Sequence, residues 1–259
     1  MDGGRILVAM RLARPERKRG FCPACGVGLS GGTEAAVEGV TVAIVLAVAA
    51  VAWAFTTWQM LGAGMTMGLG GVSSFATTWT VMMAAMMLPS AIPLVYRFAR
   101  QAEGRRGRPV ALTVLGLVYM GIWLVFGVAC YLVYEALGMP WQDQSLAGGV
   151  ALGLAALYAL TPIKRISQDR CREVCALHGP LPFDLVRAGA LSGWRYGLSC
   201  LGCSAGLMLA MVVVGISNLA WMLVLAGLVL VYKFIPSKGW RLDVALAAAV
   251  AALGIAYAR

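Results

Sequence analysis

Charged residues are scarce in this chain of 259 residues: they make up 12% of it, and histidine occurs once. Hydrophobic residues make up 61%, whereas soluble domains have roughly 45–50% apolar and about 25% charged residues. So large an apolar excess does not fit inside one water-soluble core, and the composition excludes a soluble enzyme. The chain also lacks an ATP-binding loop and a buried carboxylate pair. We therefore expect neither active pumping nor enzyme activity.

Uncharged apolar segments long enough to cross a bilayer follow one another along the chain. A membrane-spanning helix needs about 20 apolar residues. We expect spans at residues 40–61, 75–96, 110–134, 146–163 and 244–258, and two more within the uncharged run 196–232, on either side of a turn at 215–218. The sequence therefore predicts an all-α polytopic membrane protein, a bundle of about seven transmembrane helices. Six spans are the alternative, if half of the long run lies in the membrane interface.

The basic residues are distributed unevenly among the segments that connect the predicted spans. All Lys and Arg residues except Arg259 lie in the N-terminal tail, after the second span, after the fourth span or before the last span. Because Lys and Arg concentrate in cytoplasmic loops, we expect the N-terminus inside and a multi-pass protein of the bacterial inner membrane. This topology accounts for the net charge of +10 without nucleic-acid binding. It predicts a basic cytoplasmic tail, residues 1–39, and a transmembrane domain, residues 40–259, with a cytoplasmic loop at 164–195.

Most of the seven cysteines occur as close pairs, on or near the predicted cytoplasmic side. Disulfides are rarely kept in that compartment, which leaves metal binding or redox chemistry. Cys171 and Cys175 are four residues apart, and on a helix they share one face. Cys200 and Cys203 are three apart and also share a face. Because the two pairs lie at the same predicted depth, we expect them to form one thiolate metal site, whereas Cys130 is alone and is interpreted as a small core residue.

A further pair, Cys22 and Cys25, lies in the N-terminal tail within the segment Phe-Cys-Pro-Ala-Cys-Gly. This pattern is typical of one knuckle of a zinc ribbon, but a tetrahedral zinc site needs four ligands, and no second knuckle follows in the tail. The pair could collect copper, bind zinc in an intermolecular site, or have no function. The single histidine, His178, precedes Gly-Pro and is interpreted as a polar surface residue of a turn.

Methionine is abundant, with 14 residues. Five methionines are candidate ligands: Met82, Met83, Met86, Met87 and Met211. The first four share one arc of the second predicted span, and the fifth shares a helical face with Cys200. Methionine often only fills gaps between helices, but four on one face also predict a path of thioethers through the membrane. Soft thiolate and thioether ligands select Cu(I) over harder ions, so the sequence indicates monovalent copper.

Several of these residues form spaced motifs. The motifs are Trp79…Met82…Ala85-Met86-Met87-x-Pro89, Lys164 ahead of Cys171…Cys175, Gly197-x-x-Cys200-x-Gly202-Cys203…Gly206-Leu207-Met208, and Asn218-x-x-Trp221-Met222. Together they resemble a bacterial family of metal-binding integral membrane proteins, some of which are described as membrane copper chaperones for tyrosinase-type polyphenol oxidases. The resemblance covers residues 75–236 and implies copper as the cargo and a cuproprotein, such as a polyphenol oxidase, as the client. Where the family often has Gly-Cys-Cys-Trp, this chain has Gly-Cys-Ser-Ala.

The leading interpretation is an integral membrane copper-binding protein, a chaperone or transfer protein that delivers Cu(I) to a cuproenzyme. The alternative from another class is a membrane thiol–disulfide oxidoreductase that uses its paired cysteines. That activity needs redox pairs reachable from the outer side, yet no predicted outer loop contains a cysteine. It also leaves the methionine arc without a role. A third interpretation is a membrane scaffold whose cysteines are inert.

Overall fold

The structure, a computed structural model, describes residues 34–62, 71–138, 144–176, 181–214, 219–234 and 240–258. Within these residues every regular element is an α-helix. The helices are α2 (Glu34–Gly62), α3 (Val72–Gln101), α4 (Arg108–Ala136), α5 (Gln144–Ala159), α6 (Pro162–Ala176), α7 (Leu185–Val214), α8 (Leu219–Phe234) and α9 (Trp240–Ala258). Cys22, Cys25, His178 and the predicted turn at 215–218 lie outside the described residues. The all-helical fold predicted from the sequence is confirmed.

Four of the described helices are long and apolar enough to cross a membrane. They contain the segments Gly39–Gln59, Val72–Gln101, Arg108–Ala136 and Leu185–Val214. A fifth crossing results if α5 and α6 are counted as one bent span. Two further apolar helices are shorter, Ala220–Val231 and Asp243–Ala258. The protein is thus a helical membrane protein, while the number of seven spans and the cytoplasmic N-terminus stay predictions.

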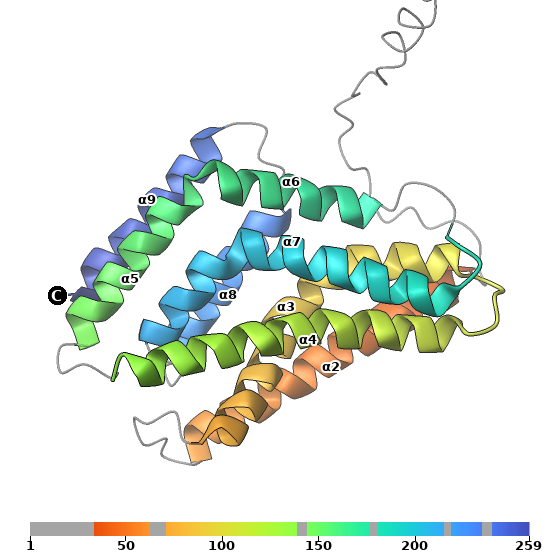
Figure 1. The fold of residues 1–259 in the computed structure, drawn as a ribbon, viewed down its shortest axis with the longest axis horizontal. Coiled ribbons are helices and arrows are strands. Elements are labelled where there is room, and N and C mark those ends of the chain that lie inside the picture. The colour runs from red at the N-terminus through yellow and green to blue at the C-terminus, as the bar shows by residue number, and fades with distance from the viewer. Residues whose placement is uncertain are drawn as a thin grey trace, which may run out of the picture.

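The helices pack in a chain of neighbours that brings distant parts of the sequence together (Figure 1). α2 packs on α3, α3 on α4, and α4 along most of α7, while α6 lies along the middle of α7 and α5 pairs with α9. The α4–α7 contact is close because α7 carries glycine where the helices touch. A Cβ atom on Gly189 or Gly193 would clash with the carbonyl oxygen of Ala111 or Leu115. Small residues four apart allow this backbone approach between membrane helices.

Two prolines interrupt the hydrogen bonding of α3 without ending the helix. Pro89 has no N–H, so the carbonyl oxygen of Ala85, four residues earlier, loses its helical donor. The indole Nε1 of Trp53 on α2 donates a hydrogen bond to this oxygen at 3.1 Å. A neighbouring helix thus satisfies the carbonyl that the proline leaves free, as polar backbone inside a membrane requires.

The fourth predicted span differs from the structure. The sequence predicts one helix over 146–163, but α5 ends at Ala159 and α6 begins at Pro162, with an angle of 66° between the two. The break has a local cause, because a residue before proline is driven out of the helical region and proline suits the first helical position. Thr161 caps the new helix: its Oγ1 accepts a hydrogen bond from the backbone N–H of Lys164 at 3.4 Å. α6 therefore leaves the direction of α5.

The segment predicted as a cytoplasmic loop, 164–195, is largely helical. It contains most of α6 and the first residues of α7, which begins eleven residues before the predicted span at 196. Asp184 explains the early start, since its Oδ1 accepts hydrogen bonds from the N–H groups of Val186 and Arg187 at 3.0 and 3.1 Å. This is the N-cap geometry that stabilises a helix start by about 1 kcal/mol. The first pair of described cysteines therefore lies on a helix that packs against α7.

Candidate metal centre

One face of α6 carries both cysteines of the first described pair. The face is formed by Lys164, Gln168, Cys171 and Cys175, at intervals of four, three and four residues, which is the spacing of one helical side. The first three are buried and Cys175 is half-buried. Because α6 packs on α7, this face and its thiols point into the protein rather than into the solvent. The helical spacing predicted for Cys171 and Cys175 is confirmed.

The second pair lies in the middle of α7. Cys200 is completely buried, and its Sγ lies 3.2 Å from the hydroxyl oxygen of Tyr119 on α4. Cys203 is half-buried, and its thiol donates a hydrogen bond to the carbonyl oxygen of Cys200 at 3.2 Å. The ring of Tyr119 packs at 5.2 Å between centroids from that of Tyr196, which lies one turn before Cys200 on α7. Two tyrosine hydroxyls therefore lie close to the cysteines of α7.

Tyr196 connects the two cysteine pairs. Its buried hydroxyl donates a hydrogen bond to the carbonyl oxygen of Ser90 on α3 at 2.6 Å. The same hydroxyl interacts electrostatically with the thiols of Cys171, Cys175 and Cys200. One side chain of α7 thus contacts α3 and lies within electrostatic range of the thiols of α6. The structure brings both pairs to the same region of the fold, as the sequence led us to expect.

The thiols do not form a ready-made cage. Within the residues described above, no group of three or more Cys, His, Asp or Glu side chains is arranged to hold a metal ion. None of the cysteines in these segments forms a disulfide bond. A site shared by Cys171, Cys175, Cys200 and Cys203 therefore stays a prediction. Any copper bound here would be held by few thiolates at a time, or with thioether sulfurs, which are soft ligands for Cu(I).

The methionine arc of α3 faces the protein interior. Met82, Met83, Met86 and Met87 are at most 2% exposed, and Met211 on α7 is 1% exposed. All five belong to the same buried cluster as Cys171 and Cys200. Their common orientation is confirmed, but burial alone is equally expected of methionines that only pack. A role as ligands stays a prediction.

Comparison with known families gives a match over most of the chain. The model of the PpoB2 family, described as a copper chaperone, matches residues 76–257. The chain belongs to the PpoB2 copper chaperone family. The matched region begins in α3 and ends in α9, so it includes both cysteine pairs of the described helices and all five candidate methionines. Neither a curated protein sequence nor a solved structure matches the chain.

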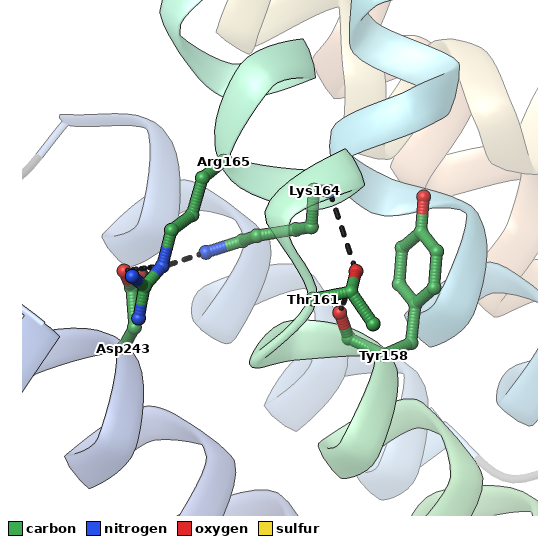
Figure 2. A network of polar contacts seen from close by, with 5 residues as sticks. All are labelled: Tyr158, Thr161, Lys164, Arg165 and Asp243. Atoms are coloured by element: carbon green, nitrogen blue, oxygen red, sulfur yellow. Dashed lines mark hydrogen bonds and ion pairs between the residues drawn. The ribbon is translucent and has the colours of Figure 1, made fainter.

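The chain also contains a buried ion cluster that sequence reasoning missed. Figure 2 shows Lys164 and Arg165, at the start of α6, reaching Asp243 at the start of α9. Lys164 Nζ lies 3.0 Å from Oδ1 of Asp243, and Arg165 Nε lies 3.2 Å from Oδ2. The side chains of Lys164 and Asp243 are only 3% and 7% exposed. This cluster joins α6, the helix of the first described cysteine pair, to α9.

A signal for this cluster was present in the sequence. We counted Lys164 among the residues of a basic cytoplasmic loop, and the predicted last span began at 244, just after the acidic residue. An aspartate at the first turn of an otherwise apolar helix is favourably placed for the helix dipole. Such a residue is rarely buried without a partner. Asp243 could therefore have predicted a buried cation, although only the fold shows that this cation comes from α6.

Proposed function

We propose that this chain accepts Cu(I) at its paired thiols and passes it along the buried methionines of α3 to a cuproprotein client at the bacterial inner membrane. The client is a polyphenol oxidase of the tyrosinase type or another copper enzyme. The role is binding and transfer of a metal ion, with no catalysed reaction. In this proposal the metal is cargo, and it stays in the protein only until the client takes it.

One observation carries the proposal: Cys171, Cys200 and the methionine arc lie in one continuous buried cluster, and Cys175 packs against it. Tyr196 connects the two cysteine helices to α3, and it does so at Ser90, three residues after Met87. Thiolates bind Cu(I) strongly, whereas neutral thioethers bind it as soft, exchangeable ligands. A route from thiolates to thioethers suits a chaperone, because the thiolates capture the ion and the weaker thioethers can release it to a client.

The N-terminal pair completes the proposed route. Cys22 and Cys25 would collect metal in the cytoplasm and present it to Cys171 and Cys175 on α6. Zinc is the alternative occupant of this knuckle, with ligands from a second molecule. Because Cys175 is half-buried, it is the thiol of the α6 pair that an incoming donor would reach first.

Metal analysis of the purified, full-length protein tests the proposal. The wild-type protein in detergent is loaded with Cu(I) under reductant, and bound copper is counted after removal of free ion. The variant with Cys171, Cys175, Cys200 and Cys203 all changed to Ser should lose most of the tightly bound copper. Cys130→Ser is the matched control, since Cys130 is a buried thiol on α4 outside the proposed site, and it should bind like the wild type.

Other results of the same measurement would favour the oxidoreductase or the scaffold interpretation over the copper chaperone. Full copper stoichiometry in the quadruple serine variant would exclude these thiols as the site. A wild-type protein that binds no copper but cycles its cysteine pairs between thiol and disulfide would be a thiol–disulfide oxidoreductase instead. A protein that does neither would be a scaffold.

A further inference from the structure

The ion cluster of Figure 2 contains two cations and one carboxylate. Lys164 and Arg165 each contact a different oxygen of Asp243, at 3.0 and 3.2 Å. Either cation alone would therefore neutralise this carboxylate. The two differ in surroundings, because the Arg165 side chain is 43% exposed and that of Lys164 is 3% exposed. The cluster thus has a net charge of +1, and its buried cation is Lys164.

Lys164 lies one helical turn before Ser167, the residue at which α6 contacts Gly202, the neighbour of Cys203. On α5, the hydroxyl of Tyr158 donates a hydrogen bond to the carbonyl oxygen of Gly202 at 2.5 Å. Ser167 on α6 lies against the same glycine, because a Cβ atom at Gly202 would clash with the Ser167 hydroxyl. The segment from Tyr158 to Ser167 therefore bends around Gly202 and Cys203. Lys164 lies within it, and its ammonium group interacts electrostatically with the thiol of Cys203.

Binding of Cu(I) by thiols changes the charge of the site. Each thiol must lose its proton to become a ligand, so that copper binding releases protons to the solvent. One Cu(I) ion with two thiolates has a net charge of −1, and a third thiolate makes it −2. A buried charge is costly unless an opposite charge or hydrogen bonds compensate it. Cys203 is half-buried and its neighbour in the pair, Cys200, is completely buried, so an anionic complex there needs a cation.

We propose that Lys164 is a positioning residue that supplies the counter-charge for an anionic Cu(I)–thiolate complex involving Cys203. It is not a ligand, because an ammonium group has no free electron pair to donate. Arg165 also neutralises Asp243, so Lys164 can face the copper complex without leaving the carboxylate unpaired. This inference rests on the proposed function of copper binding at the thiols and adds a residue outside the ligand set.

The two cations of the cluster provide a matched pair of variants. Lys164→Met and Arg165→Met each remove one cation and leave the other to pair with Asp243. We measure the Cu(I) affinity of the full-length protein in detergent by competition with a coloured Cu(I) chelator, and helix content and thermal stability by circular dichroism. Lys164→Met should weaken Cu(I) binding by about ten- to hundredfold, the usual effect of losing a group that supports metal ligands. Arg165→Met should weaken binding by less than Lys164→Met, because Lys164 would then have to neutralise Asp243 alone, and Lys164→Arg should restore most of the affinity.

A second comparison detects a merely structural effect. In a Cys203→Ser background, Lys164→Met should have little further effect on Cu(I) affinity, since the proposed interaction is already lost. Equal weakening by Lys164→Met and Arg165→Met, together with equal loss of thermal stability, would mean that the cluster only pins α6 to α9. Wild-type affinity in Lys164→Met would also overturn the inference. Absence of Cu(I) binding in the wild-type protein would instead overturn the proposed function, so the two failures are distinguishable.

Discussion

The hydroxyl oxygen of Tyr119 lies 3.2 Å from the sulfur of Cys200, although the two residues are on different helices and 81 positions apart. The same hydroxyl lies 3.3 Å from the carbonyl oxygen of Met87. Tyr119 therefore contacts a candidate thiol ligand and the backbone of a candidate thioether ligand at once. When Cys200 is a thiolate, Tyr119 can only be the donor, and a hydrogen bond to a charged acceptor is stronger than a neutral one.

Removing this hydroxyl should weaken copper binding more than folding. For Tyr119→Phe we expect Cu(I) affinity to fall about tenfold, because groups that hydrogen-bond to metal ligands support them. The loss of stability should be about 1 kcal/mol, as for one hydrogen bond. Chelator competition and thermal denaturation measure the two effects. Tyr134→Phe, 15 residues and about 22 Å further along α4, is the control, and equal copper affinities in the two variants would contradict the prediction.

The methionine arc can be separated from ordinary packing by leucine. Leucine has a similar volume and polarity, so each change should cost under about 1.5 kcal/mol if the methionine only packs. With Met82, Met83, Met86 and Met87 all changed to Leu, we expect normal insertion and abundance and normal copper at the cysteines, but no delivery to a copper enzyme outside the cytoplasm. The readout is the activity of that enzyme in cells. Met120→Leu, a half-buried methionine on α4, should deliver normally.

Normal delivery by the quadruple leucine variant would show that the arc is packing. The transfer route would then lie elsewhere. Changes at Met208 and Met222, which are also buried, should have a smaller effect than the quadruple change.

The contact between α4 and α7 should not tolerate a single methyl group. In Gly193→Ala the new Cβ would meet the backbone oxygen of Leu115, which cannot move aside as a side-chain tip can. We expect a loss of about 1–3 kcal/mol, typical of overpacking, seen as a lower thermal unfolding temperature in detergent. Gly116→Ala on α4, where a Cβ meets nothing within 4 Å, is the control. It should be neutral or stabilising, since alanine favours helices, and equal stabilities would be inconsistent with close packing at Gly193.

The number of spans determines on which side the C-terminus lies. Seven spans, or five with α5 and α6 as one bent crossing, leave the two termini on opposite sides of the membrane. Four or six spans leave them on the same side. Based on the distribution of basic residues, we expect a cytoplasmic reporter to be active at the N-terminus and a periplasmic reporter to be active after Arg259. Reporters active on one side for both ends would exclude seven spans.

Local sequence patterns predicted the helices and the methionine arc well. Met82 and Met86 share a face because residues four apart do so on any α-helix. The predicted turn at 215–218 also agrees with the helix bounds, since α7 ends at Val214 and α8 begins at Leu219. The break before Pro162 was missed because it falls inside an apolar run, near the end, where hydropathy alone predicts a continuous span. Its signals, a proline and a capping threonine, are local and could have been used.

Contacts between distant helices could not be predicted in the same way. Lys164 looked like a surface residue because its partner Asp243 is 79 positions away. Only the packing of α5 against α9, which places the start of α6 beside the start of α9, brings them together. The convergence of Cys171, Cys175 and Cys200 on Tyr196 likewise depends on the register of α3, α6 and α7. Periodicity predicts which residues share a helical face, but not which faces meet. The shared thiolate site thus stays a prediction.

The hydrogen bond from Trp53 to Ala85 has a consequence for where the protein can be shortened. Trp53 lies on α2, outside the matched residues 76–257, yet it serves the carbonyl next to Met86 that Pro89 leaves without a donor. A fragment cut to the matched residues would expose this oxygen inside the bilayer, at a cost of about 1–3 kcal/mol, directly beside the methionine arc. The limits of the family match are therefore not the limits of a stable fragment, and any minimal version of this protein has to retain α2.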